Sequence, residues 1–571
     1  MFKRIGPVLA SACALAVALT ACSGARHNAG LPSGAGGAEP QGAGSAPASF
    51  HLVPTSPVAG SGPSGASGPY RVVMSDLPRE VRGARAKPHP EHDRDAVNLD
   101  SSKWGLQPTL VHSRGVSVRE GDVPRKNAAT GRAVTSQSRA PLNATVLGGT
   151  NIDGEIDVTG GYNGTYLMTI SDAGYVDVLG APGLVKRVSQ HNFYCATGLP
   201  ACSGPGQGAV DDRITYDPIG QRWIVTALYL SSGTGKTPVI LAVSQTSDPT
   251  GAYNLYQFSA CGDTYVGDSD QPHTGFNNQW IVVNASCGTG YPSTTVFNKS
   301  NVYAGGALNL NSTYWQFVDP VSSGGNNHDN PALTYAPSES REFLTAGTIV
   351  SGNAAVLYSY LAGPVSSPTF YAGVLQVMTS FPATGPVAVD APGCTGCINT
   401  FTNGVIHSST VAALNTGQTA IISTAMYGDP ANARSTQSVQ IAMNTSTVTA
   451  TSLQFAGGIP GAGVLGSEIA MPAVPNTAFN AAILVYGRSR SDYYPGVRVA
   501  QWNMDGNYMV YVNELQQGTI LPSAYNQGRW MDFMSAISPV PGTSQMVAGG
   551  PVARPSTSDP DRSDYFAIFT P

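Results

Sequence analysis

Acidic residues recur shortly ahead of Pro-containing turns in the chain beyond residue 200. Each stands a few positions ahead of such a turn and of the apolar run after it, as in DDRITYDPIGQRW and SDQPHTGFNNQW. The acids are Asp212, Asp270, Asp329, Glu468 and Asp532. One carboxylate per repeated unit would ring the mouth of a channel shared by all the units. The alternative is that each acid accepts hydrogen bonds from backbone N–H groups where a strand begins, a role that Asp fills well.

Carboxylates at a channel mouth could hydrolyse glycosidic bonds, and the candidate catalytic residues are Asp270, His273 and Asp212. That chemistry needs two carboxyl groups roughly 5–9 Å apart, one of them with a raised pKa. His273 follows Asp270 by three residues, and a histidine beside carboxylates can act as a general base. An isolated histidine on a loop is the more common case. The chain has no HExxH, GxSxG or GxxxxGKS/T motif, so the residues leave open whether the protein is an enzyme.

Calcium is the ion that the acidic loops favour. TNIDGEID, DTYVGDSD and SDPDRSD place carboxylates on Gly-, Pro- and Asn-containing loops, and Ca²⁺ takes about six to eight oxygen ligands. The candidate ligands are Asp263, Asp268 and Asp270, although no loop has EF-hand spacing and strand capping would use the same acids. No other cofactor is expected, because helical patterns of the kind that build dinucleotide-binding folds are scarce.

Short alternating apolar runs must position these side chains. Runs such as RWIVTALYL, VILAVS, QWIVVN and AAILVYG are bounded by Gly, Pro and Asn, a pattern that predicts strands. The runs form about seven groups of roughly 60 residues, slightly longer than a typical propeller blade. A small group of strands buries both faces only by stacking against similar neighbours. We therefore predict an all-β fold, a β-propeller most simply of seven blades, over residues 141–571.

The first 22 residues predict export from the cytoplasm. Lys3 and Arg4 precede the apolar run VLASACALAVAL, which is too short to span a bilayer of about 30 Å. The run ends in LTAC, which resembles the lipobox of bacterial lipoproteins. That resemblance implies cleavage after residue 21, a diacylglyceryl thioether on Cys22 and, because Ser23 follows it, sorting to the outer membrane. Ordinary secretion after cleavage at an A-x-A site is the alternative.

Two zones separate this signal from the predicted propeller. Residues 22–69 are mostly Gly, Ala, Ser and Pro and cannot bury a core, so we expect a disordered tether. Residues 70–140 hold 13 Lys and Arg against 8 Asp and Glu, and we expect a solvated, largely irregular spacer, with contact to anionic lipid or polysaccharide as the alternative. Residues 141–571 hold 14 basic and 26 acidic residues, a balance that argues against nucleic acid as a partner.

Six cysteines remain once Cys13, in the signal, and Cys22 are set aside. An even number in an exported chain predicts disulfides. The cysteines fall into sequence-local couples, so the predicted bonds are Cys195–Cys202, Cys261–Cys287 and Cys394–Cys397. The CxxC of the last couple could instead bind zinc or act in redox chemistry, but it has no second CxxC and no H-x3–5-H partner.

Four segments with distinctive motifs follow one another along the chain: YDPIGQRWIVTALY, ILAVSQTSDPTGAYNLYQF, DQPHTGFNNQWIVVNAS and QGRWMDFMSAISPVPG. Their YD-x4-RW, AVS-x3-DPTG, D-x-P-x-x-G and RWxD(Y/F) elements resemble those of an exported, mostly uncharacterised bacterial β-propeller family. The likeness covers about residues 145–571 and implies the fold far more than an activity. Met531 stands where that family has Gly, which weakens a ligand role for Asp532.

These observations favour a lipid-anchored, extracytoplasmic β-propeller that binds a surface polysaccharide or protein. Aromatic side chains on loops could stack on sugars or anchor an interface, although packing inside blades is the alternative. The residues in question are Tyr253, Tyr256, Tyr265, Trp315, Tyr493 and Tyr494. The second functional hypothesis is a polysaccharide hydrolase or lyase that uses the channel-mouth carboxylates. Expected partners are thus the membrane, through the lipid, and a polysaccharide or surface protein.

Overall fold

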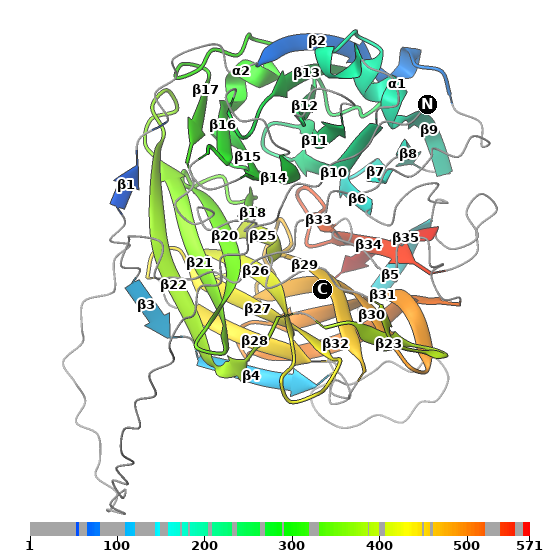
Figure 1. Cartoon of the computed structure of the whole chain (residues 1–571), viewed down its shortest axis with the longest axis vertical. Coiled ribbons are helices and arrows are strands. Elements are labelled where there is room, and N and C mark those ends of the chain that lie inside the picture. Colours follow the sequence, from blue (N-terminus) through cyan, green and yellow to red (C-terminus); the bar gives the residue numbers. More distant parts are fainter. Residues whose placement is uncertain are drawn as a thin grey trace, which may run out of the picture. The chain divides into compact units, whose positions relative to one another are not determined.

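Antiparallel strands pair in successive four-stranded groups in a computed structural model of the chain (Figure 1). The structure describes residues 53–55, 57, 66–79, 109–112, 114–119, 143–148, 158–171, 174–180, 183–203, 208–230, 237–262, 269–287, 291–318, 330–385, 387–398, 406–447, 450–456, 461–519, 537–553 and 563–570. All of them belong to the unit Pro47–Pro571. Within these ranges the strands divide into consecutive groups, three of which are bridged into one 14-stranded sheet.

The groups follow one another along the sequence. They are β6 (Val158–Tyr162), β7 (Leu167–Ser171), β8 (Tyr175–Gly180) and β9 (Gly183–Ser189); β10 (Gly208–Asp217), β11 (Arg222–Leu230), β12 (Val239–Ser244) and β13 (Ala252–Phe258); β14 (Asp270–Phe276), β15 (Trp280–Ser286), β16 (Thr294–Asn298) and β17 (Tyr314–Phe317); β18 (Asn330–Pro331), β20 (Glu342–Val350), β21 (Asn353–Ala362) and β22 (Thr369–Pro382); β25 (Ile406–Ala413), β26 (Thr419–Gly428), β27 (Thr436–Asn444) and β28 (Ala450–Ala456); β29 (Gly463–Ala470), β30 (Ala481–Arg490), β31 (Tyr493–Asn503) and β32 (Tyr508–Gly518); and β33 (Ile537–Pro539), β34 (Met546–Val552), β35 (Ser563–Thr570) and β5 (Asn143–Gly148).

The first strands of the groups surround a common axis. β6 contacts β10, β10 contacts β14, and the series continues through β18, β25, β29 and β33, which contacts β6 again. The short strand β19 (Leu333–Thr334) adds parallel bridges between β14 and β25. Such a closed ring of radially stacked sheets is a β-propeller, so the predicted fold class is confirmed.

The ring closes through strands from both ends of the propeller sequence. β5 pairs antiparallel with β35, with Val146 opposite Ala567, and β35 in turn pairs with β34. This shared group leaves no open gap between the first and last blades, because the N-terminal strand completes a sheet that the C-terminal strands begin.

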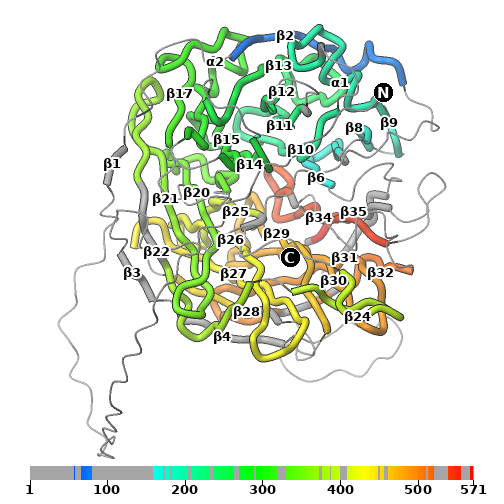
Figure 2. The backbone as a smooth tube through the Cα atoms, viewed as in Figure 1, coloured from blue at the N-terminus to red at the C-terminus, as the bar shows by residue number. Residues whose placement is uncertain are grey.

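The segment before residue 120 contains strands that the sequence did not predict. β1 (Val53–Thr55) and β3 (Thr109–His112) pair with β22, β2 (Ser67–Val73) pairs with β13, and β4 (Arg114–Arg119) pairs with β28. Figure 2 shows β2 beside β13 at the outer edge of its blade. The expectation of a tether ending at 69 and a largely irregular spacer is therefore corrected within these ranges. Edge strands of blades offer unpaired backbone groups that even a poorly apolar segment can join.

The core lies between neighbouring blades, which explains the continuous apolar runs. Every residue of β12 and of β15 is buried, as expected for strands covered on both faces. One core cluster joins Met168 and Val178 of the first group to Trp223 and Ile240 of the second.

The YD-x4-RW segment locks one blade to the next. The rings of Tyr216 and Trp223 pack with centroids 5.0 Å apart. Asp217 is fully buried and lies 2.5 Å from the Nζ of Lys299, which begins the short helix α2 (Lys299–Tyr303) after β16. The Tyr303 hydroxyl also donates to Asp217, over 2.6 Å. Asp217 therefore connects two neighbouring blades through an ion pair and a hydrogen bond, at the end of the propeller where β10 ends.

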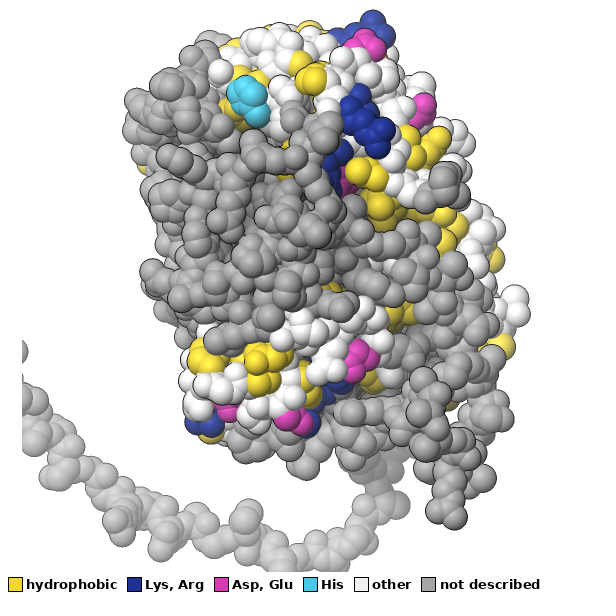
Figure 3. Space-filling model, turned by 90° about the vertical axis from the view of Figure 1, so that its right-hand side faces the viewer, with side chains coloured by type: hydrophobic (Ala, Val, Ile, Leu, Met, Phe, Trp, Pro, Cys, Tyr) yellow, Lys and Arg dark blue, Asp and Glu magenta, His cyan; other side chains and the backbone are white. Residues whose placement is uncertain are grey.

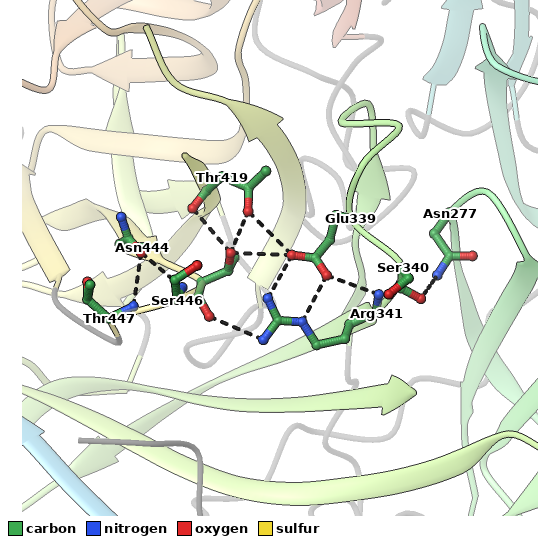
Figure 4. A network of polar contacts seen from close by, with 9 residues as sticks. Asn277, Glu339, Ser340, Arg341, Thr419, Asn444, Ser446 and Thr447 are labelled. Atoms are coloured by element: carbon green, nitrogen blue, oxygen red, sulfur yellow. Dashed lines mark hydrogen bonds and ion pairs between the residues drawn. The ribbon is translucent and has the colours of Figure 1, made fainter. Parts of the chain in front are cut away.

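A second polar lock joins three blades at the same end of the strands (Figure 4). Arg341 donates two hydrogen bonds of 2.8 Å to Glu339, and its third contact reaches the carbonyl of Thr445 over 3.2 Å. The hydroxyl of Thr419 donates to Glu339 over 3.3 Å, and the Nδ2 of Asn277 donates to the Ser340 carbonyl over 3.0 Å. Burial alone would raise the pKa of Glu339, but the hydrogen bonds and charge of Arg341 outweigh it and hold that pKa below its usual range. A bidentate pair of this kind fixes geometry as well as charge.

Candidate functional site at the propeller axis

A small polar cavity lies where the first strands of the blades converge. Its volume is about 50 Å³. The lining residues come from β6, β10, β14, β18, β19, β25 and β29, and they are Thr159, Gly160, Arg213, Ile214, Thr215, His273, Thr274, Asn330, Leu333, Ser408, Ser409 and Glu468. A cavity of this volume has room for a few water molecules, whereas pockets that enclose a drug-sized ligand measure about 300–1,000 Å³.

Three charged or titratable side chains meet in this cavity from three different blades. The Nη1 of Arg213 donates to the Oε1 of Glu468 over 3.4 Å, and its Nη2 lies 3.3 Å from the Nδ1 of His273. The side chains of Arg213 and Glu468 are 13% and 8% exposed, and His273 is buried. The arginine therefore bridges a carboxylate and an imidazole that the sequence analysis had placed in separate roles.

Bulges in the innermost strands place Arg213 and His273 in the cavity. β10 is irregular between Val210 and Arg213, and β14 is irregular between Asp270 and His273. Asp211 and Gln271 take positive φ angles of 54° and 44° within these bulges. A bulge inserts a residue and re-aims the side chains that follow. The carboxylate of Asp211 also accepts a hydrogen bond from the Gln271 N–H over 3.2 Å, which is the backbone-capping role considered for acids at these positions.

Asp212 does not line the cavity. Its carboxylate accepts hydrogen bonds of 2.5 Å from the Tyr194 hydroxyl and from the Gln190 side-chain amide. Both donors lie on α1 (Gln190–Cys195), the helix that precedes β10. Burial raises the pKa of Asp212 to about 8, against the opposing effect of the Tyr194 hydrogen bond. This proposed channel-mouth acid therefore holds α1 onto the innermost strand, because the bulge changes the face to which its side chain points.

The other proposed acids are divided between the cavity and positions that the structure leaves out. Glu468 is the one carboxylate that lines the cavity among the described residues. Asp270 is the first residue of β14, partly exposed and opposite Ser286, and does not line the cavity. Asp329 and Asp532 lie outside the described residues.

Two of the three candidate calcium ligands, Asp263 and Asp268, lie outside the described residues. The third, Asp270, is described. Within the described ranges no three His, Cys, Asp or Glu side chains are grouped so that they could hold a metal ion. The calcium site stays a sequence-based prediction.

All three predicted disulfides are formed. Cys195–Cys202 lies between β9 and β10, and Cys261–Cys287 joins the segment after β13 to the end of β15. Cys394–Cys397 lies in β24 (Cys394–Ile398), which with β23 (Val389–Ala391) forms a hairpin ahead of β25. Each bond thus fixes a connection at the end of the propeller where the innermost strands begin. We call this end the entrance face.

Most of the aromatic residues expected on loops are packed inside the blades. Tyr253, Tyr256 and Trp315 lie on β13 and β17 and are buried. Tyr493 is largely buried and Tyr494 is partly exposed, both at the start of β31; Tyr265 lies outside the described residues. The stacking role is therefore wrong for the three buried residues, since alternation along a strand with two covered faces buries successive side chains.

The comparisons with known proteins give distant likenesses in structure. No protein-family profile and no curated protein sequence matches the chain. Solved structures similar to it include the arabinanase Arb43A of Bacillus subtilis (14% identity, 54% of this chain and 100% of that one, TM-score 0.29). A thermostable family-43 glycoside hydrolase (8% identity, 64% and 90%, 0.27) and the extracellular domains 1–2 of Drosophila Semaphorin 1b (8%, 75% and 87%, 0.33) are also similar. At these TM-scores the similar structures say nothing about function. The functional proposal below therefore depends on the geometry of this chain alone.

Arg213 is the functional candidate that the sequence analysis missed. It follows the Asp211–Asp212 pair directly in DDRITYD, so a basic residue beside two acids on a predicted innermost strand was the signal. Its partner Glu468 is 255 positions away, and no local pattern connects the two.

Proposed function

We propose that the protein is an exported, lipid-anchored β-propeller that binds a polysaccharide or protein of the cell surface through its entrance face. The observation that carries this proposal is the small size of the axial cavity and the kind of residues that line it. Its volume of about 50 Å³ is too small for a sugar ring, and a single carboxylate lines it among the described residues. Glycoside hydrolysis needs a pair of carboxyl groups on either side of the scissile bond. The disulfide-fixed connections of the entrance face support binding, because rigid loops lose less entropy when they hold a partner.

The binding role is tested with the full chain and a panel of surface glycans. We expect retention of the protein on at least one glycan with no release of reducing ends. Release of reducing ends that is lost in Asp270→Asn, His273→Asn or Glu468→Gln would instead establish the hydrolase or lyase hypothesis. Retention on a surface protein and on no glycan would leave binding intact and change the class of partner.

The anchor is proposed from the LTAC sequence and Cys22, with outer-membrane sorting from Ser23. Among the described residues no helix is both long and apolar enough to cross a membrane. Labelling with palmitate should mark the wild-type protein, and Cys22→Ser should move the protein into the soluble fraction. A mutant that still sediments with membranes, together with an unlabelled wild type, would contradict lipidation.

A further inference from the structure

A tyrosine hydroxyl lies against one sulfur of the Cys195–Cys202 disulfide. The Oη of Tyr229, on β11, is 2.9 Å from the Sγ of Cys195. A disulfide sulfur carries no proton, so in this contact the hydroxyl donates and the sulfur accepts. Burial raises the pKa of Tyr229 to about 12, which keeps the proton on its oxygen. The bond therefore has a hydrogen-bond donor in place at its Cys195 end.

An exposed histidine extends this contact toward solvent. The Nδ1 of His191 is 3.3 Å from the same Tyr229 oxygen. His191 and Cys195 stand at positions i and i+4 of α1, so their side chains lie on one side of that helix. His191 is exposed, and a histidine side chain (cyan) is visible at the surface drawn in Figure 3. When Nδ1 carries a proton, it donates to the Tyr229 oxygen, and the hydroxyl donates to the sulfur.

The Cys195–Cys202 bond is accessible while the chain is folded. Both cysteines are partly exposed, and the connecting residues 196–200 are mostly exposed. Cys261 and Cys287, by contrast, are only 1% and 6% exposed. Cysteines that take part in redox chemistry are partly accessible and have a neighbour that stabilises the thiolate, whereas purely structural ones are buried. An external thiol can therefore reach the first bond and not the second.

Both ends of this connection are held without the disulfide. At the α1 end, Gln190 and Tyr194 each donate a hydrogen bond of 2.5 Å to the carboxylate of Asp212. At the other end, the Ala201 N–H donates to the side-chain oxygen of Gln257 over 2.7 Å. Cleavage of the bond would therefore leave the two sulfurs near each other, so that the bond can form again.

We propose that Cys195–Cys202 is a redox-active disulfide that exchanges with an external dithiol, a function beyond the proposed binding role. A thiolate of the dithiol attacks the Sγ of Cys202, the bond between the two cysteine sulfurs breaks, and its electron pair stays on Cys195. The second thiol of the dithiol then displaces Cys202 from the mixed disulfide. The dithiol is oxidised to a disulfide, both cysteines are reduced, and the two protons of the dithiol pass to them.

The Tyr229 hydroxyl promotes the first of these steps. A thiolate leaves faster when the pKa of its thiol is lower, and a hydrogen bond to the charged form lowers that pKa. The hydroxyl already lies at the sulfur on which the negative charge develops, and His191 supports it by donating to its oxygen. The same contact assigns the roles of the two cysteines, since it makes Cys195 the leaving group and Cys202 the sulfur that is attacked.

The test exposes the folded full chain to dithiothreitol and follows each disulfide by alkylation and mass spectrometry. Tyr229→Phe is the main variant, because it removes the hydroxyl and keeps the ring. It should slow the reduction of Cys195–Cys202 about tenfold or more, as expected for loss of a hydrogen bond to a charged group. Cys394–Cys397 is also partly exposed, and no donor is bonded to its sulfurs among the described residues, so its rate should not change. An unchanged rate for the first bond, or equal slowing of both, would overturn the proposal.

Tyr256→Phe is the matched control. Tyr256 is buried on β13, and its hydroxyl donates to the carbonyl of Val302 over 3.2 Å and not to a sulfur. This variant also loses one buried hydroxyl and should react as the wild type does. Slowing as large as that in Tyr229→Phe would assign the effect to the loss of any buried tyrosine hydroxyl and overturn the proposal.

The buried Cys261–Cys287 bond reports on unfolding in the same samples. It should stay oxidised while Cys195–Cys202 is reduced, because the reaction needs no unfolding. Reduction of the two bonds at the same rate in the wild type would show that the thiol reaches them only after the chain unfolds, and would overturn the proposal.

Two further measurements test the assigned roles. A monothiol such as mercaptoethanesulfonate, trapped by acid, should be found as a mixed disulfide on Cys202; trapping mainly on Cys195 would overturn the assigned step. His191→Ala should slow the reduction, and His191→Asn, which places an amide N–H near the position of Nδ1, should restore most of the rate. Equal slowing in the two variants would overturn the role of His191 as a donor to Tyr229.

Discussion

The guanidinium of Arg213 lies 3.4 Å from the carboxylate of Glu468, although 255 residues separate them in the sequence. They come from the innermost strands β10 and β29 of two different blades. The pair therefore forms only when the ring of blades is assembled, and its integrity reports on the whole propeller.

Glu468→Gln should lower the free energy of unfolding by about 3 kcal/mol, because it takes one counter-charge away from the largely buried guanidinium of Arg213. Denaturant unfolding of the two proteins provides the measurement. The double variant Arg213→Met with Glu468→Met should recover much of that loss, since it removes both charges from the cavity. If Glu468→Gln unfolds at the same denaturant concentration as the wild type, the ion pair contributes nothing to stability.

Stability should fall as the pH rises from about 4 to about 8 because of Asp212. Burial raises its folded-state pKa to about 8, whereas the unfolded chain has a value of about 3.9. Between these two pKa values the folded state binds one more proton than the unfolded state, so the free energy of unfolding decreases as the pH rises. The stabilisation that Asp212 contributes is fully present below the lower pKa and is lost above the upper one. Asp212→Asn stays neutral and should flatten this dependence in urea titrations at pH 5 and pH 8. An unchanged slope in the variant would assign the effect to other groups.

Loss of the Cys261–Cys287 disulfide should destabilise the chain by about 3 kcal/mol, because the bond closes 26 residues of sequence and restricts the unfolded state. The double variant Cys261→Ser with Cys287→Ser should show a lower melting temperature with an unchanged far-ultraviolet dichroism spectrum. The same treatment of Cys394 and Cys397, which are three residues apart, is the control and should cost less. Equal losses in the two double variants would contradict the dependence on loop length.

Truncation after Asp564 should unfold the entire propeller and not merely fray its end. The removed residues form most of β35, which pairs with β34 on one side and β5 on the other. Without them the first and last blades are no longer joined. Limited proteolysis should then cut the truncated chain throughout residues 158–553, whereas a stable core of native resistance would contradict closure through β35.

The strands and disulfides were predictable because their causes are local. Runs such as VILAVS at β12 are buried over their full length, and the cysteines of each couple are only 7, 26 or 3 positions apart in the sequence. The strands β1–β4 were missed because their residues are polar, basic or rich in Pro and Gly. They pair only because β13, β22 and β28 offer free edges hundreds of positions away.

The sequence by itself determined the all-β class, the three disulfide pairs and the place of Asp212, Asp270 and Glu468 on innermost strands, since alternation, cysteine spacing and turn residues act over a few positions. The tertiary structure decided what those acids do. Bulges of one residue placed Arg213 and His273 in the axial cavity and turned Asp212 onto α1. Closure of the ring brought Glu468 to Arg213. A one-residue change of register sends a side chain to the opposite face of a strand, and it depends on contacts between blades that no local pattern encodes.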